Sequence, residues 1–136
     1  MKIMLDEGAE MPTRAHPWDA GLDLYAKKGG YIPGECSAEF DTGVHLDIPK
    51  GFVGFVKSRS GLMCKNHIIT DGTIDSGYTG SIRVKLFNLG MTAYKVNPGD
   101  KIAQLVIQPC VCPPLELVDS LDTTDRGANG FGSTGR

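Results

Sequence analysis

Residues 126–136 carry groups that suit a nucleotide with several phosphates. Arg126 offers a planar fork of N–H donors, and the run 132–135 (GSTG) offers backbone N–H groups and hydroxyls to phosphate oxygens. Phe131 offers a ring that can stack on a base. A segment with four glycines and one large apolar side chain cannot bury enough surface to order itself, so we expect a mobile tail in the free protein. Composition alone favours a plain solvated tail. The choice between such a tail and a nucleotide-binding segment therefore depends on the other motifs of the chain.

Four further clusters combine charged, hydroxyl or amide side chains with glycines. They are Ala20-Gly21-Leu22-Asp23-Leu24, Ser58-Arg59-Ser60-Gly61, 72–78 (GTIDSGY) and 99–105 (GDKIAQL). The second cluster suits a phosphate but also an ordinary turn. The third places an acid, Asp75, three residues before a phenol, Tyr78, and the fourth offers Gln104 as an amide donor. Taken singly, none of the four identifies a function.

Short strands must position these clusters. Eighteen glycines and eight prolines separate short apolar runs, and no window of helix length shows a three-four periodicity. Apolar residues alternate with polar ones or form short runs in four stretches, which predict strands over 44–48, 52–56, 82–87 and 102–107. Only Ser60 to Asn66 indicates a short helix. Asp71-Gly72, between two apolar runs, is a strong signal for a two-residue hairpin.

Many short strands indicate an all-β fold, a sandwich or barrel. We expect a β domain over residues 1–120 and a tail over 121–136. The formal net charge of −2 gives no reason to expect a polymeric nucleic acid as partner. No apolar stretch approaches the roughly 20 residues of a membrane span, and the first residues lack the apolar core of a signal peptide. These observations favour a cytoplasmic protein that does not bind membranes.

The four cysteines could in principle form disulfides, but reduced thiols are the expectation in a chain without secretion signals. Cys110-Val111-Cys112 lacks the second pair of ligands that a structural zinc site needs, and the three histidines show no matching spacing. We therefore expect no structural zinc.

Taken together, in this order and spacing, the five clusters resemble the five sequence motifs of the homotrimeric deoxyuridine triphosphatases, or dUTPases. The matching stretches are AGLDLYA, SRSGL, GTIDSGYTG, GDKIAQL and RGANGFGSTG. They spread over residues 20–135, and the combination is specific, although AGLDL or GDKIAQL alone would not be. The resemblance implies an antiparallel β-barrel of jelly-roll type. It also implies a homotrimer in which motifs from two subunits form each pocket and the third subunit lends its C-terminal tail.

The activity implied by the resemblance is hydrolysis of dUTP to dUMP and pyrophosphate with Mg²⁺. Asp75 matches the base that activates the attacking water, and Asp23 matches the acid that holds the hydration shell of the metal. Backbone groups near Asp71-Gly72 would read uracil, and Tyr78 would pack beneath the deoxyribose and leave no room for a 2′-hydroxyl. The implied substrate-binding residues are Arg59, Ser60, Gly61, Gly72, Ile74, Tyr78, Gln104, Arg126, Phe131, Gly132, Ser133 and Thr134.

Some positions depart from the family pattern. Trp18-Asp19 stands where smaller residues are usual, Leu22 replaces a commoner tyrosine, and the stretch between Ser60 and Asp75 is short. Two alternatives stay open. A dCTP deaminase shares the fold, but it relies on a glutamate where Lys85 stands here, and it lacks this type of tail. A nucleotide-sensing binding protein on the same scaffold would not need Asp75 or a complete tail.

Overall fold

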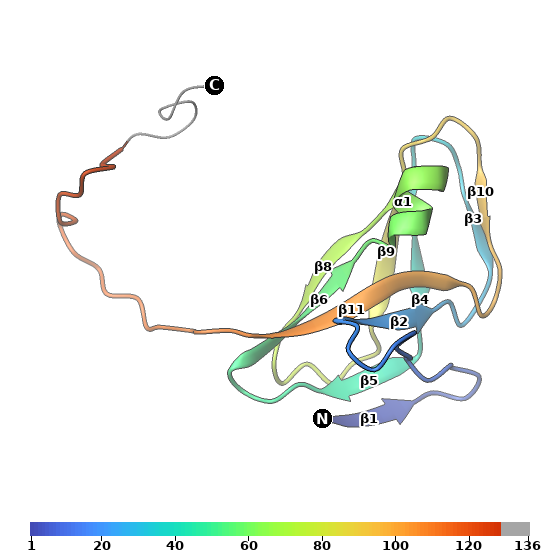
Figure 1. The fold of residues 1–136 in the computed structure, drawn as a ribbon, viewed down its shortest axis with the longest axis horizontal. Coiled ribbons are helices and arrows are strands. Elements are labelled where there is room, and N and C mark those ends of the chain that lie inside the picture. Colours follow the sequence, from blue (N-terminus) through green and yellow to red (C-terminus); the bar gives the residue numbers. More distant parts are fainter. Residues whose placement is uncertain (129–136) are drawn as a thin grey trace.

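The structure, a computed structural model, describes residues 1–128 of the 136-residue chain. Strands make up nearly all of its regular structure, and one short helix interrupts them (Figure 1). The elements in chain order are β1 (Lys2–Leu5), β2 (Gly21–Tyr25), β3 (Gly30–Ile32), β4 (Ser37–Asp41), β5 (Val44–Asp47), β6 (Phe52–Lys57), α1 (Ser60–Asn66), β7 (Ile68–Ile69), β8 (Asp71–Ile74), β9 (Arg83–Asn88), β10 (Tyr94–Val96) and β11 (Lys101–Pro109). The prediction of an antiparallel all-β fold of jelly-roll type is confirmed.

Every strand pairing is antiparallel. One sheet has the order β2-β11-β6-β8, a second has the order β4-β9-β7, and two short ribbons pair β1 with β5 and β10 with β3. β11 is the longest strand and crosses the body of the molecule (Figure 1). Because β11 pairs with β2 on one side and β6 on the other, it joins parts of the chain that lie far apart in sequence.

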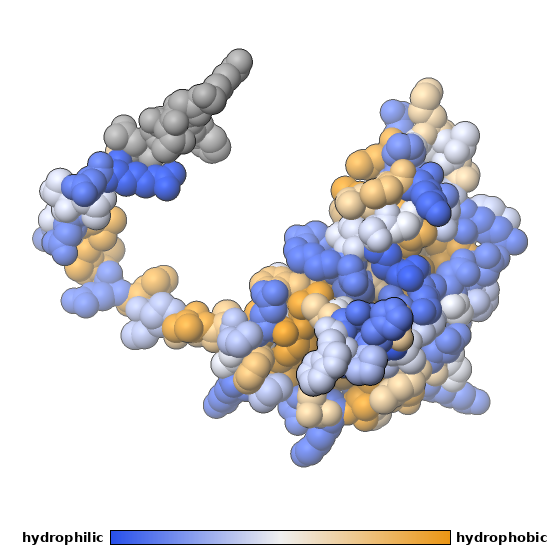
Figure 2. Space-filling view, in the orientation of Figure 1, coloured by the Kyte–Doolittle hydropathy of each residue, from blue (hydrophilic) through white to orange (hydrophobic). Residues whose placement is uncertain are grey.

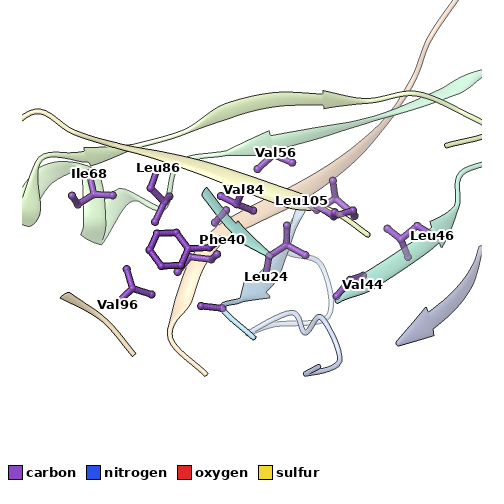
Figure 3. Close-up of a cluster of buried hydrophobic side chains, with 14 of the residues drawn as sticks. Leu24, Phe40, Val44, Leu46, Val56, Ile68, Val84, Leu86, Val96 and Leu105 are labelled. Atoms are coloured by element: carbon purple, nitrogen blue, oxygen red, sulfur yellow. The ribbon is translucent and has the colours of Figure 1, made fainter. Parts of the chain in front are cut away.

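Apolar side chains from the two larger sheets meet in one core. Leu24 of β2 and Leu105 of β11 lie in the same cluster as Val84 and Leu86 of β9 (Figure 3). Along β9 buried and exposed residues alternate strictly, as expected for a strand with one face toward the core. Each large apolar side chain buried in this way stabilises the fold by about 1.5–3 kcal/mol. The strands predicted over 44–48, 52–56, 82–87 and 102–107 are all present.

The predicted helix is also confirmed, with the same bounds, Ser60–Asn66. It begins after Arg59, whose backbone is extended, and it ends at His67, which adopts the left-handed conformation with φ of 57°. The backbone N–H of His67 donates to the carbonyl oxygen of Leu62, which satisfies one of the last carbonyls of the helix. Ser60 and Gly61 therefore form the first turn of a helix that is separated from the end of β6 by two residues.

The predicted hairpin at Asp71-Gly72 is wrong. Both residues lie in β8, where Asp71 is opposite Lys57 and Gly72 is opposite Val56. A two-residue hairpin would need β7 and β8 to pair with each other, but β7 pairs with β9 in the other sheet. The chain changes sheets at Thr70, which bonds to Ser58 and to the carbonyl oxygen of Lys85. Pairing between distant strands therefore overrides the local turn signal.

Asn88, at the end of β9, is a buried polar residue that ties two loops together, the one after β3 and the one after β9. Its Nδ2 donates to the carbonyl oxygens of Ile32 at 3.0 Å, Pro33 at 3.2 Å and Thr92 at 2.8 Å. Its Oδ1 accepts from the backbone N–H of Gly90 at 2.9 Å. Because the side chain is only 2% exposed, water cannot replace these bonds.

We expect Asn88→Ala to lower the free energy of unfolding by about 2–4 kcal/mol, because each buried polar group left unpaired costs about 1–3 kcal/mol. Urea denaturation followed by circular dichroism measures the change. Asn66→Ala is the matched control, because Asn66 is exposed and its loss should change the free energy by less than about 0.5 kcal/mol. Equal effects of the two substitutions would contradict the role of Asn88.

Candidate functional site

Asp23 of β2 lies between two cationic side chains. Its Oδ1 accepts from Nε of Arg59 at 3.0 Å, and its Oδ2 accepts from Nζ of Lys101 at 2.8 Å. The Asp23 side chain is only 14% exposed, so solvent screens these pairs weakly. The hydrogen bond to Asp23 also raises the pKa of Lys101 above its ordinary value. Asp23 therefore holds a guanidinium and an ammonium group in place on one face of the sheet.

Gln104 lies next to Asp23, because the two residues are opposite each other on β11 and β2. Its Nε2 donates to the carbonyl oxygen of Ser58 at 3.1 Å, which ties the start of the Arg59 loop to β11. A Cβ atom at Gly21 would lie 2.3 Å from Oε1 of Gln104. A side chain at position 21 would therefore displace the Gln104 amide from its place beside Ser58.

Asp23, Arg59 and Gln104 line a depression of about 390 Å³, which we call the phosphate-type depression. It contains residues of three of the clusters that the sequence singled out, and five of the predicted site residues. The lining residues are Ala15, Asp19, Ala20, Gly21, Asp23, Arg59, Ser60, Gly61, Gln104 and Val106. Hydroxyl, amide and guanidinium donors thus converge on one place, which is the chemistry that phosphate oxygens require.

A second depression, of about 180 Å³, lies at the end of β8. Its lining residues are Thr73, Ile74, Asp75, Tyr78 and Arg83, so it brings together the predicted acid and phenol. The Tyr78 hydroxyl donates to the carbonyl oxygen of Ser81 at 3.0 Å, and a Cβ atom at Gly80 would lie within 2.6 Å of the Tyr78 ring. The bond to Ser81 therefore places the ring against Gly80, where a larger residue would displace it, while the Asp75 side chain faces solvent.

The two depressions have no lining residue in common. Asp75, Tyr78 and Ile74 belong to one, whereas Asp23, Arg59 and Gln104 belong to the other. Gly72, on β8, lies opposite Val56, and a Cβ atom there would meet Val56 only at 3.6 Å, an ordinary contact. Packing within this chain therefore does not require a glycine at position 72.

Sequence reasoning gave no role to Lys101, which pairs with Asp23, or to Gly21, although both lie in clusters that it singled out. The register of the β11–β2 pair shifts between Lys101 and Ala103, so Lys101 and Gln104 are both directed toward Asp23. Without that irregularity, residues three positions apart on a strand would point to opposite faces. Membership in the same GDKIAQL cluster as Gln104 was the one available signal for Lys101.

Residues 110–128, which we call the arm, leave the end of β11 and run away from the body (Figure 1). Several apolar side chains along it face solvent, among them Leu115 at 98% and Leu117 at 100% exposure (Figure 2). The predicted residue Arg126 lies on this arm. The predicted contacts at Phe131, Gly132, Ser133 and Thr134 lie outside the described residues.

Residues 1–128 contain no group of three or more His, Cys, Asp or Glu side chains that could hold a metal ion. No helix in the same part of the chain is long and apolar enough to cross a membrane.

His45 connects the loop that carries Tyr78 to the N-terminal part of the chain. Its Nδ1 lies 2.8 Å from the carbonyl oxygen of Thr79, and its Nε2 lies 3.1 Å from Oδ1 of Asp6. Both partners are acceptors, so both ring nitrogens donate only when the ring is protonated. The Thr79 carbonyl and then Asp6 raise the pKa of His45 above its ordinary value, against an opposing effect of burial.

Protonated His45 should therefore stabilise the fold in a pH-dependent way. Because the folded-state pKa is raised, this contribution is fully present below the unfolded-state pKa of about 6.5 and is lost as pH rises through the folded-state pKa. The melting temperature of the wild type should fall across that window, and His45→Gln should flatten the fall. His16→Gln, at an exposed histidine, should leave it unchanged. A pH profile of melting that is the same in the wild type and His45→Gln would refute the role of His45.

Comparisons with known proteins agree with this geometry. A family model described as dUTPase matches residues 7–135. The chain is 45% identical over 132 residues to the probable deoxyuridine 5′-triphosphate nucleotidohydrolase of Schizosaccharomyces pombe, with 96% of this chain and 94% of that protein covered.

Two solved phage structures are also similar. The dUTPase of Staphylococcus bacteriophage 80alpha, solved with dUpNHpp, superposes with a TM-score of 0.93 at 30% identity, and the match covers 99% of this chain and 98% of that one. A mutant dUTPase from phage phi11 of S. aureus, whose structure describes the coordination of a structural Mg(II) ion, gives a TM-score of 0.84 at 31% identity. That match covers 90% of this chain and 98% of the phage chain.

Proposed function

Because the chain belongs to the dUTPase family and is therefore a dUTP diphosphatase, we propose that Asp75 activates the water that splits dUTP into dUMP and pyrophosphate. This assignment rests on one observation: the phosphate-binding donors line one depression, and the Asp75 carboxylate lines the other. Phosphate-binding donors gather around Arg59 and Gln104, whereas the solvent-facing carboxylate of Asp75 lies beside Tyr78. Such a carboxylate can orient a water and accept its proton in the transition state.

Arg59 is the main phosphate ligand in this proposal. Its Nε donates to Asp23, and its Nη1 lies 3.4 Å from the carbonyl oxygen of Lys101. The described residues accept no hydrogen bond from Nη2, so its two N–H groups are available to phosphate oxygens. Ser60, Gly61 and Gln104 add a hydroxyl, a backbone N–H and an amide to the same depression.

Asp23 and Asp19 are the carboxylates of the phosphate-type depression. Both oxygens of Asp23 already accept hydrogen bonds from cations, which supports contact with the hydration shell of Mg²⁺ and not a direct bond. The residues fit an ion that arrives bound to the triphosphate, since Mg²⁺ keeps several waters and needs only one or two protein carboxylates. When bound, Mg²⁺ neutralises phosphate charge and stabilises the leaving pyrophosphate.

The uracil base would be read by the outer edge of β8. This strand is the last of its sheet and pairs only with β6, so the backbone groups of Gly72 and Ile74 that face away from β6 lack a partner strand among the described residues. Fixed backbone donors and acceptors would pair with uracil and mispair with cytosine. Tyr78, held by Gly80 and Ser81, would exclude a 2′-hydroxyl by tight contact under the sugar.

We also propose a homotrimer with shared active sites. One chain holds the phosphate donors and Asp75 in separate depressions, so a neighbouring copy would have to bring the two sets together. A three-fold assembly does this in three equivalent sites. The exposed apolar side chains of the arm support a path of the arm across a neighbouring subunit.

A dCTP deaminase is not favoured. The position that would carry the required glutamate is Lys85, whose ammonium group lies over the ring of Phe87, 5.5 Å from its centroid.

The four cysteines are free, which supports a reducing compartment such as the cytoplasm as the site of action.

Release of pyrophosphate from dUTP, dCTP, dTTP and UTP in the presence of Mg²⁺ tests the proposed function, and only dUTP should be cleaved efficiently.

Asp75→Asn should keep nucleotide affinity and lose about 10²–10⁴ in kcat, the usual cost of removing a general base. Asp47→Asn, at an exposed aspartate on β5, is the control and should keep full activity. If Asp75→Asn kept more than about a tenth of the wild-type kcat, Asp75 would not be the base.

Deletion of residues 126–136 should leave a folded trimer but abolish most turnover, with little effect on dUMP binding. The reason is that a closing segment acts on the triphosphate and excludes water, so its binding energy is used mainly in the transition state. Light scattering checks the trimer, and calorimetry checks dUMP affinity. Phe131→Ala should show a milder loss, equivalent to about 1–3 kcal/mol of base stacking. Full activity of the truncated protein would rule out a closing segment.

A further inference from the structure

Two cysteine side chains lie together where β11 ends and the arm begins. Sγ of Cys110 is 4.0 Å from Sγ of Cys112, as expected for residues i and i+2 of an extended chain, which share a face. The backbone N–H of Cys110 donates to the carbonyl oxygen of Gly51 at 2.8 Å, so the first cysteine is tied to the sheet. Val111, between them, is exposed.

The spacing of the two sulfur atoms suits a shared ligand better than a disulfide bond. Two residues of extended chain separate Cα atoms by about 6.6 Å, near the upper end of the range found in disulfides, about 4.4–6.8 Å. A tetrahedral zinc ion with Zn–S bonds of about 2.3 Å holds two sulfur atoms about 3.8 Å apart. The observed 4.0 Å is close to that value.

The surroundings of the pair also favour a cation. Pro109 pairs with Phe52, and Gly54 pairs with Ile74, so the ends of β11 and β8 lie on two sides of β6 and Asp75 follows nearby. The negative charge of the Asp75 carboxylate on that side of the sheet attracts a positive ion to the pair.

We propose that Cys110 and Cys112 form a binding site for a thiophilic metal cation of the Zn²⁺ and Cd²⁺ class. Two S–M bonds form, each thiol loses its proton to solvent, and water completes the coordination, so no oxidant is required. This two-sulfur site differs from a four-ligand structural zinc site, which the chain lacks. It also differs from the Mg²⁺ of the reaction, because Mg²⁺ prefers oxygen ligands and thiolates select softer metals.

Titration of the reduced full-length protein with Cd²⁺ tests the site. Binding should give a sulfur-to-metal charge-transfer band in the ultraviolet, with about one Cd²⁺ bound and about two protons released per chain. Cys110→Ser and Cys112→Ser should each weaken binding by about 100-fold or more, since loss of even an outer-shell partner costs about 10–100-fold. A large excess of Mg²⁺ should not displace the Cd²⁺.

The matched control is the double variant Cys36→Ser with Cys64→Ser, which removes the other two free thiols and should bind Cd²⁺ like the wild type. Melting temperatures of the metal-free variants, expected near that of the wild type, show that all of them are folded. Loss of the band in the control, or an unchanged affinity in Cys110→Ser, would overturn the proposal. A stoichiometry of about one Cd²⁺ per two chains would overturn it as well, because the sulfur ligands would then come from different molecules.

Discussion

Strand β11 pairs with β2 along one edge and with β6 along the other, and this double ladder fixes where the phosphate-binding groups lie. Gln104 is opposite Asp23 on one side and opposite Lys57 on the other, so residues from three distant parts of the chain meet at one level of the sheet. A slip of one residue in either pairing would turn these side chains toward the core and the core side chains outward. The buried Leu24 and Leu105 prevent such a slip, because they need the opposite face.

The same ladder produces the charge balance of the site. Asp23 neutralises one of the two positive charges of Arg59 and Lys101, so the group keeps a net positive charge for an anionic ligand. An isolated pair of cations would repel each other, and their long side chains would lose much rotamer freedom on binding a phosphate. Since Asp23 holds both in place beforehand, part of that cost is met during folding and not during binding.

Sequence patterns predicted what depends on local chemistry and alternation. The strand at 82–87 follows from the alternation of apolar and polar side chains, and the short helix Ser60–Asn66 was also expected; both were confirmed. The hairpin at Asp71-Gly72 was wrong because β6, distant in sequence, competes successfully for β8. Lys101 was missed because a register irregularity redirects its side chain, and no local pattern signals where a bulge will form. The contacts assigned to Phe131 and its neighbours stay predictions.

Three features of the single chain support the proposed assembly with further copies of the same chain. The edge of β8 is without a partner strand in the described residues, the arm exposes Leu115 and Leu117, and the two depressions are separate. An open strand edge and exposed apolar side chains are liabilities for a lone domain, because they promote irregular association. A closed three-fold assembly limits that association to three equivalent contacts. In the proposed homotrimer the edge of β8 stays open for the base. The donors and acceptors of the base can then form the backbone hydrogen bonds that a further strand would otherwise form with β8.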